Sequence, residues 1–253
     1  MIYLKNVTIS FGDQIILDNI DFKVNKGETA VILGPSGAGK SSLLKVILGL
    51  WKVDSGNVII DGIDITNLSE RELFPIRQRM AMVFQGNALF DSLTVEQNVA
   101  YFLRENKNLS EKVIREKVRE CLSFVNLDDT ENLYPEELSG GMKKRVAIAR
   151  AIASNPEIIL YDEPTTGLDP INSKVIIDLI KKLQKNGATS IVVTHIIRDA
   201  LAVGDSLTLI EDGKLVASGT VDQLLTSDNK FINEFFYEIH DEAALLNQIK
   251  TKN

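Results

Sequence analysis

The eight residues GPSGAGKS, at positions 34–41, constrain the fold of this chain more than any other segment. They follow the continuous apolar run TAVIL and precede SSLLKVILGL, in which apolar residues recur at helical spacing. A glycine-rich loop between a buried strand and a helix presents backbone N–H groups that cradle phosphate. The pattern therefore predicts that Lys40 reaches the β- and γ-phosphates of a nucleoside triphosphate and that Ser41 coordinates Mg²⁺.

Two further apolar runs end in residues that suit the same chemistry. EIILYDE ends in Asp162, which can hold the metal directly or through water, and in Glu163, which is placed to polarise an attacking water. TSIVVTH ends in His195, at the strand edge where ligands of parallel sheets bind. An acidic pair can also be a solvated turn, and a histidine at a strand end can be structural. The phosphate-binding loop on the same chain favours the catalytic interpretation of all three.

The segment LSGGM, at residues 138–142, predicts a second anion site. Ser139 is a good helix N-cap, and Gly140 and Gly141 leave backbone N–H groups bare at the helix start. The alternative is a helix cap followed by a solvated basic turn, Lys143 to Arg145. If both sites bind one nucleotide, they must come from different subunits.

The order of the apolar patterns predicts an α/β fold. Short period-2 runs fill the first third of the chain and indicate antiparallel strands, whereas strands and helices alternate in the last third, which indicates a mainly parallel sheet. Between them lies a helical stretch, about residues 86–153, with a pattern that is helical throughout from residue 95 to about 125 and a possible cap at Thr94 and Gln97. We expect a P-loop NTPase (RecA-like) core, an N-terminal antiparallel β-subdomain and an inserted α-helical subdomain.

Composition and charge limit the classes of partner that the chain can have. The net charge of −7 gives no global basic field, so we expect no nucleic-acid partner, although a local basic groove would escape this argument. No apolar run approaches the roughly 20 residues that span a bilayer, and the N-terminus lacks a signal-peptide pattern. We therefore expect a cytoplasmic chain whose membrane role comes through a partner. The single cysteine, Cys121, excludes an internal disulfide and is expected to be a buried core thiol.

These motifs, in this order, resemble those of the ABC ATPases over about residues 2–225. The resemblance implies an ABC ATPase domain over residues 1–225, followed by a short helical tail over residues 226–253. It implies that Gln85 contacts Mg²⁺ and the attacking water, that residues 167–169 form a D-loop, and that Phe11 stacks on adenine, unless it is a core residue of the first hairpin. The implied ATP-binding residues are Phe11, Gly34, Pro35, Ser36, Gly37, Ala38, Gly39, Lys40, Ser41, Ser42, Ser139, Gly140 and Gly141. The implied metal ligands are Ser41, Gln85 and Asp162, and the implied catalytic residues are Glu163, His195 and Gln85.

The resemblance also implies an assembly and a substrate. In this family two subunits sandwich two ATP molecules head to tail between one phosphate loop and the partner's signature. Met142 stands where the family signature usually has glutamine, and with residues 84–103 and 162–171 it makes the chain most similar to the Mla/MCE-type ATPases. That similarity implies phospholipid transport between bacterial membranes, integral-membrane permease subunits, an MCE-domain substrate-binding protein and a peripheral position on the cytoplasmic side of the inner membrane.

Three other functions stay open at this stage. The first is an ATPase subunit of an importer of amino acids or other small solutes. The second is a soluble ABC ATPase that acts on DNA or the ribosome, although such chains usually carry long coiled-coil insertions or two ATPase halves. The third is a non-hydrolysing regulator, which conflicts with the presence of Glu163 and His195.

Two surface segments are candidates for contacts with partners. Ala88, Leu89 and Phe90 are expected to form an apolar lip that receives a short helix of the permease, or simply to pack over the helical subdomain. In the tail, an apolar stripe is expected to dock either on the chain's own core or on the partner ATPase subunit. The stripe consists of Phe231, Phe235, Phe236 and Ile239.

Overall fold

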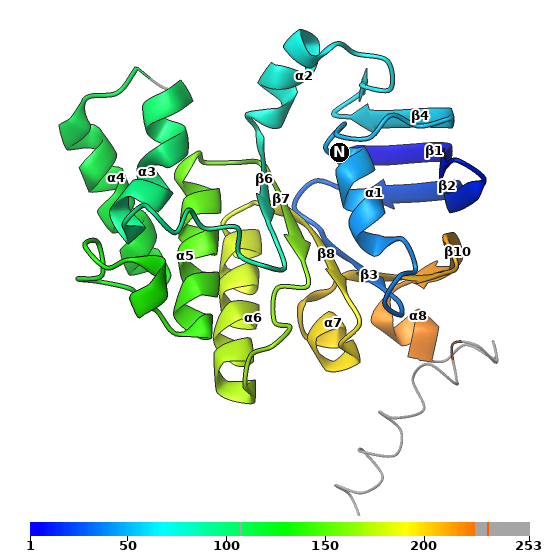
Figure 1. Cartoon of the computed structure of the whole chain (residues 1–253). Helices are drawn as coiled ribbons and strands as arrows, with labels where there is room; N and C mark the ends of the chain where they lie inside the picture. The colour runs from blue at the N-terminus through cyan, green and yellow to red at the C-terminus, as the bar shows by residue number, and fades with distance from the viewer. Residues whose placement is uncertain (107, 226–231, 233–253) are drawn as a thin grey trace, which may run out of the picture.

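Two sheets organise the computed structural model, which describes residues 1–106, 108–225 and 232 (Figure 1). The first sheet is antiparallel, in the order β2-β1-β4-β5. The second has the order β10-β9-β3-β8-β7-β6 and is parallel except for the β9–β10 hairpin. The strands are β1 (Ile2–Phe11), β2 (Gln14–Val24), β3 (Thr29–Leu33), β4 (Ser55–Ile60), β5 (Ile63–Asp64), β6 (Met80–Val83), β7 (Ile158–Asp162), β8 (Thr189–Thr194), β9 (Ser206–Glu211) and β10 (Lys214–Gly219).

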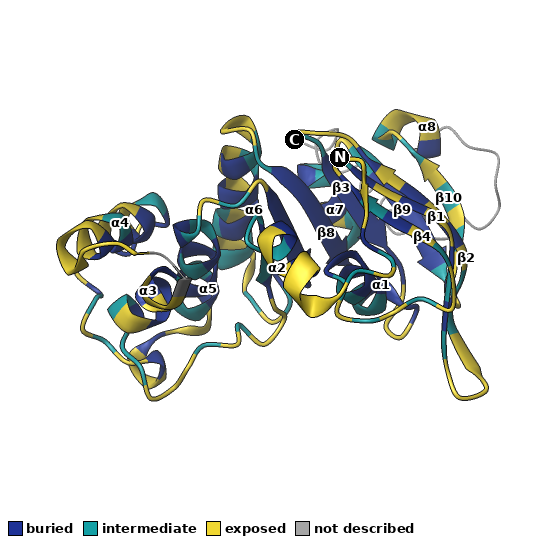
Figure 2. Ribbon diagram, turned by 90° about the horizontal axis from the view of Figure 1, so that it is seen from above, coloured by how far each residue is buried: buried dark blue, intermediate teal, exposed yellow. Residues whose placement is uncertain are grey.

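The parallel sheet is buried on both faces, which explains its continuous apolar runs. All five residues of β3 are inaccessible, and successive side chains point to opposite faces. Ala30 and Ile32 join the core that the sheet shares with α1 and the antiparallel sheet. Val31 and Leu33 join a second core with α5, α6 and α7. Figure 2 shows β3 and β8 as dark, buried ribbons between these two layers.

Between β6 and β7 the described residues form helices and loops, and these lie at one end of the molecule (Figure 1). The predicted α/β fold is therefore confirmed, with its helical insertion between two neighbouring strands of the parallel sheet. The helices are α1 (Lys40–Ile47), α2 (Glu70–Arg77), α3 (Val95–Asn106), α4 (Glu111–Phe124), the short 3-10 helix η1 (Pro135–Glu137), α5 (Gly140–Ala153), α6 (Pro170–Lys185), α7 (Ile197–Val203) and α8 (Val221–Leu225).

The prediction of continuous helix from residue 95 to about 125 is wrong. α3 ends at Asn106 and α4 begins at Glu111 after Ser110, whose hydroxyl accepts a hydrogen bond from the backbone N–H of Val113. Asparagine and serine side chains compete for backbone hydrogen bonds and favour such caps over helix interiors. The predicted cap at the start of α3 is confirmed, because Thr94 and Gln97 hydrogen-bond each other's backbone N–H groups.

Residues 226–231 and 233–253 lie outside the described part of the chain, and the predicted apolar stripe of the tail lies there with them. Ile232 is buried and belongs to the same core as Leu224 of α8. Among the described helices, none has both the length and the apolar composition that a membrane crossing requires.

Candidate active site

The carboxyl ends of β3, β7 and β8 and the segment after β6 meet around a cleft of about 390 Å³. Such sheet edges are the usual ligand sites of doubly wound folds. The cleft brings together residues that the sequence motifs place far apart along the chain. Its lining is Ile16, Ser36, Gly37, Gly39, Lys40, Ser41, Ser42, Gln85, Glu163 and His195.

The phosphate-binding loop owes its shape to its three glycines. Gly37 and Gly39 have φ values of 84° and 101°, in the left-handed region that favours glycine. Gly34 packs so closely on β9 that a Cβ atom there would lie 2.2 Å from the carbonyl oxygen of Ile210. Lys40, 6% exposed, begins α1 and donates through Nζ to the carbonyls of Gly34 and Pro35, at 2.8 and 2.9 Å. The ammonium group is therefore held at the mouth of a loop of backbone N–H donors.

Ser41 and Asp162 form a pair of oxygen ligands beside this loop. The hydroxyl of Ser41 donates to Oδ1 of Asp162 at 2.8 Å. Burial raises the pKa of Asp162 and the charge of Glu163 adds to this, whereas the hydrogen bond from Ser41 opposes it. The described residues contain no cluster of three or more His, Cys, Asp or Glu side chains that could hold a metal ion. A hydroxyl and one carboxylate fit Mg²⁺, which takes one or two carboxylates and completes its shell with phosphate oxygens and water.

Glu163 lies at the centre of the charged network. Its Oε1 lies 3.4 Å from Nζ of Lys40, and its Oε2 lies 2.9 Å from Nδ1 of His195. The hydroxyl of Thr166 also donates to Oε2, at 2.9 Å. Burial raises the pKa of Glu163, but the hydrogen bonds from His195 and Thr166 and the charges of His195 and Lys40 outweigh it, so the pKa is lowered. The carboxylate is therefore ionised at neutral pH and can orient and polarise a water molecule.

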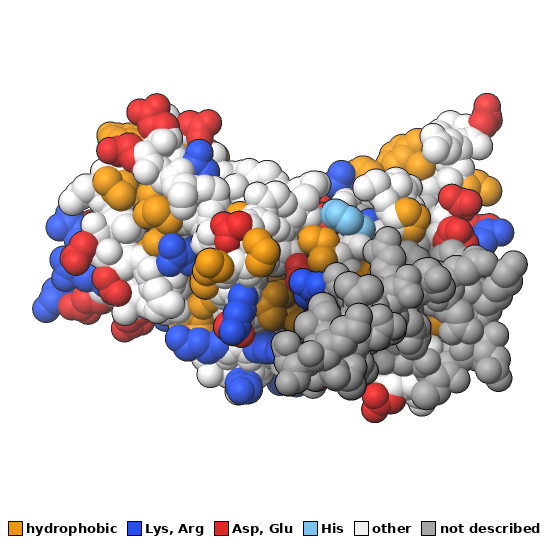
Figure 3. Space-filling view, turned by 90° about the horizontal axis from the view of Figure 1, so that it is seen from below, with side chains coloured by type: hydrophobic (Ala, Val, Ile, Leu, Met, Phe, Trp, Pro, Cys, Tyr) orange, Lys and Arg blue, Asp and Glu red, His pale blue; other side chains and the backbone are white. Residues whose placement is uncertain are grey.

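The ionised state of Glu163 fixes the role of Nδ1 of His195 in their hydrogen bond. A carboxylate without a proton only accepts hydrogen bonds, so Nδ1 of His195 must carry the proton that it shares with Oε2. Nε2 is then free to face a ligand. The side chain is 45% exposed, and Figure 3 shows histidine atoms in pale blue on the surface of the molecule.

The predicted second anion site lies outside the cleft of its own chain. Ser139 caps α5 and accepts a hydrogen bond from the backbone N–H of Met142 at 3.3 Å. Gly141 packs against α6, where a Cβ atom would lie 2.5 Å from Oδ1 of Asn172. Neither Ser139 nor the two glycines line the cleft, so this chain alone does not close both anion sites around one ligand.

The sequence motifs did not predict several residues at or near this site, and they left two interpretations open for the aromatic residue Phe11. Phe11 is 52% exposed and meets Trp51 edge to face with ring centroids 4.8 Å apart, so its interpretation as a core residue is wrong. The Nζ of Lys45 lies 4.4 Å from the centre of the Trp51 ring. Thr166 and Lys144 also contact Glu163. Trp51 could have been found from the sequence, because it is an aromatic residue shortly after the helix that follows the phosphate loop. No sequence pattern marks Thr166 or Lys144 as residues of the site.

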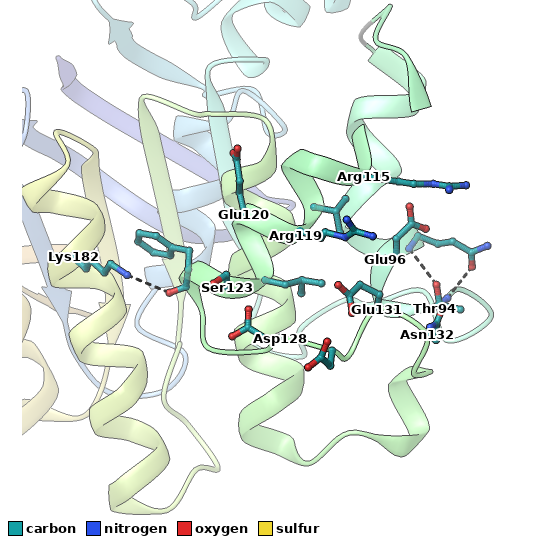
Figure 4. A pocket seen from close by; sticks show the side chains of 15 residues that line it. Thr94, Glu96, Arg115, Arg119, Glu120, Ser123, Asp128, Glu131, Asn132 and Lys182 are labelled. Atoms are coloured by element: carbon teal, nitrogen blue, oxygen red, sulfur yellow. Dashed lines mark hydrogen bonds between the residues drawn. The ribbon is translucent and has the colours of Figure 1, made fainter. Parts of the chain in front are cut away.

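A larger hollow of about 1180 Å³ lies on the helical insertion, between α4, the loop after it and α6 (Figure 4). Arg115, Arg119 and Lys182 line it together with Glu131 and Asp128. It shares no residue with the cleft and offers no glycine-rich helix start to a phosphate. It is therefore not the predicted nucleotide site.

The fold and the cleft define a P-loop nucleoside triphosphatase. A model of the ABC transporter family matches residues 17–166. The intermembrane phospholipid transport system ATP-binding protein MlaF of Haemophilus influenzae is 45% identical over 236 residues, which cover 93% of this chain and 89% of that protein. The probable ribonucleotide transport ATP-binding protein mkl of Mycobacterium tuberculosis is 40% identical over 92% of this chain and 66% of its own length. The chain therefore belongs to the ABC transporter family and is an ATPase of that family.

A solved structure agrees with this assignment. It is the dimeric post-hydrolysis state of an ATP-binding cassette bound to ADP and Pi, and it superposes with a TM-score of 0.80 at 39% identity. The match covers 87% of this chain and 99% of that one.

Proposed function

We propose that this chain is the ATP-hydrolysing subunit of a transporter that moves phospholipid between bacterial membranes. The MlaF relative, with its near full-length similarity, supports the choice of substrate. The network of Lys40, Glu163 and His195 around one cleft supports the hydrolysis. This network is the observation that carries the proposal, because it combines a phosphate ligand, an ionised carboxylate and an oriented imidazole.

The chemistry follows from the positions of these side chains. Lys40 and the loop N–H groups bind the β- and γ-phosphates, and Phe11 stacks on the adenine. Glu163 orients the attacking water, and His195 contacts the γ-phosphate through Nε2 while its Nδ1–H donates to Glu163. Mg²⁺, with Ser41 and Asp162 as ligands and Gln85 nearby, would offset the charge on the phosphates.

A second copy of the chain is expected to complete each site. Ser139, Gly140 and Gly141 lie outside the cleft of their own chain, and their helix start suits the γ-phosphate of a nucleotide on the partner. The dimeric form of the related cassette supports the association of two copies.

The segment after Gln85 is the proposed contact with integral-membrane permease subunits. Phe90 and Tyr101 are 43% and 45% exposed and stack with ring centroids 4.7 Å apart. Such an exposed aromatic pair suits a short helix of a permease. We propose that this contact holds the chain peripherally on the cytoplasmic side of the inner membrane, in a complex that includes an MCE-domain protein.

The test has two stages. In the first, Glu163→Gln should keep ATP binding, abolish turnover and give an ATP-dependent dimer in gel filtration, and normal turnover would contradict the role of Glu163. In the second, the complex is purified from membranes and its bound molecules are identified by mass spectrometry. Bound phospholipid supports the proposal, whereas nucleotides or amino acids as cargo would favour the alternative importers, including a function like the one that names the mycobacterial relative.

A further inference from the structure

The side chain of Lys144 is buried, with 3% exposure, although it belongs to a basic run near the start of α5. The interpretation of that run as a solvated turn is wrong for Lys144. Its Nζ donates to the carbonyl of Gln85 at 2.6 Å and lies 3.4 Å from the carbonyls of Phe84 and Glu163. An ammonium group has three N–H donors, and these three carbonyls match them.

Packing alone does not account for a lysine at this position. Burial lowers the pKa of Lys144, and the charges of Asp162 and Glu163 oppose that shift. Removing an ammonium group from water costs free energy, which hydrogen bonds to carbonyls offset only in part. A methionine has nearly the same length and would fill the space without this cost. The reason for a lysine at position 144 must therefore lie in its three hydrogen bonds.

The acceptors of Lys144 lie on the two segments that carry Gln85 and Glu163. These segments leave the adjacent strands β6 and β7. Glu163 has a φ of 49°, which persists in a non-glycine residue only where the surroundings hold it. Its N–H donates to the carbonyl of Val193 at 3.0 Å, and its own carbonyl faces Lys144. Both ends of this strained residue are thus fixed, which fixes the direction of its carboxylate.

The same helix holds the segment after Gln85 at a second point. Arg150 of α5 donates to the carbonyls of Asn87 and Ala88 at 2.9 and 2.6 Å. Both of these residues also have positive φ values. α5 begins at Gly140 after its cap Ser139, so one helix joins the anion site offered to the partner to the cleft of the same chain.

We propose that Lys144 is a positioning residue that ties the first turns of α5 to Gln85 and Glu163. Any displacement of α5 must then move these two residues, or break the hydrogen bonds of Lys144. The side chain of Lys144 therefore couples two sites of the same chain. One is the cleft that holds a nucleotide, and the other is the start of α5, which faces the nucleotide of the partner. The inference rests on the proposed catalytic roles of Gln85 and Glu163.

Steady-state ATP hydrolysis by the full chain tests the proposal. For Lys144→Met we expect kcat to fall at least about 10-fold, with KM and the affinity for a fluorescent ATP analogue changed by less than about 2-fold. Lys144→Gln keeps two N–H donors and should be intermediate. Lys185→Met makes the same change at an exposed site of α6 and should behave like the wild type. An unchanged kcat in Lys144→Met, or loss of nucleotide affinity in parallel with kcat, would overturn the proposal. If Lys144→Met does not fold, Lys144→Gln is judged by the same criteria.

A double-mutant cycle separates positioning from general destabilisation. Two fold-reductions in kcat are compared: that caused by Lys144→Met in the wild type and that caused by the same change in a Gln85→Ala background. If Lys144 acts through Gln85, the second should be smaller than the first by a factor of at least about 3. Multiplicative effects would overturn the inference. A wild-type chain without ATPase activity, or a Gln85→Ala variant with full activity, would instead contradict the proposed function or site, so the two failures are distinguishable.

Discussion

The Nδ1 atom of His195 lies 2.9 Å from Oε2 of Glu163, and this contact joins the two side chains of the charged network. The hydrogen bond and the charge of His195 lower the pKa of Glu163 against the opposing effect of burial. In return, the carboxylate keeps the proton of the imidazole on Nδ1. The contact therefore favours the ionised carboxylate and makes Nδ1 the donating nitrogen of the ring.

The acid side of the pH–rate profile should report this contact. Glu163 must be ionised to orient water, so activity falls as the pH drops through the pKa of Glu163 in the folded protein. His195→Ala removes two of the effects that lower this pKa and leaves burial, which raises it. We expect the acid limb of kcat/KM to move to higher pH and kcat at neutral pH to fall at least about 10-fold.

Thr166→Val is the matched variant for this prediction. It removes another hydrogen bond to Oε2 and leaves His195 in place. Its acid limb should move in the same direction by a smaller amount. An acid limb that stays in place in both variants would show that a group other than Glu163 controls it.

Lys40→Ala should abolish productive nucleotide binding. The substitution removes the cation that holds the carbonyls of Gly34 and Pro35 and lies 3.4 Å from Glu163. The loop then loses a ligand for phosphate and the charge that faces the carboxylate. Titration with a fluorescent ATP analogue should give at least about a 100-fold weaker Kd. Lys52→Ala, at an exposed lysine, should bind like the wild type, and ordinary binding by Lys40→Ala would contradict the role of the loop.

The sequence predicted the fold and the cleft because their signals are local. Gly34, Lys40 and Ser41 lie within one octapeptide, and Asp162, Glu163 and His195 each end an apolar strand, so parallel pairing brings them together. α2 was missed because Pro75 hides its periodicity, although Ser69 and Glu72 form a capping box at its start. The sequence did not predict the break between α3 and α4, because apolar residues at helical spacing occur both before and after it.

The role of Lys144 could not be predicted from local patterns. Its acceptors are 59, 60 and 19 residues away along the chain, and they are backbone carbonyls, which carry no side-chain signal. A cation in a basic run predicts exposure, and only the tertiary structure reverses that expectation.

The two glycines of the LSGGM segment should respond differently to alanine. At Gly141 a Cβ atom would lie 2.5 Å from Oδ1 and 2.7 Å from Cγ of Asn172, so the Asn172 side chain or the start of one of the two helices must shift. We expect Gly141→Ala to cost about 1–3 kcal/mol of unfolding free energy, as overpacking does. At Gly140 the nearest atom to a Cβ is Cδ2 of Leu168 at 3.9 Å, so Gly140→Ala should be nearly neutral. Urea unfolding of both variants checks this.

A second substitution sharpens the comparison. Asn172→Ala removes the two atoms that come closest to the new Cβ and leaves the Cβ of Asn172 at 3.2 Å. Combined with Gly141→Ala it should recover part of the lost stability, which is a coupling between residues in contact. Equal costs for the alanines at positions 140 and 141, or no recovery in the double variant, would contradict this account of Gly141.

The thiol of Cys121 should be unreactive in the folded protein. Burial on α4 raises its pKa to about 11, and of the smaller effects the charge of Lys117 lowers the pKa whereas that of Glu120 raises it. At pH 8 the reactive thiolate is therefore scarce, and access to it is blocked as well. Alkylation by iodoacetamide should be at least about 100-fold slower in buffer than in denaturant. The unfolded thiol ionises at lower pH than the folded one. The free energy of unfolding should therefore fall as the pH rises from the pKa of the unfolded thiol to that of the folded one, and Cys121→Ala should remove this loss. Rapid alkylation without denaturant would mean that the core around α4 opens far more readily than its burial implies.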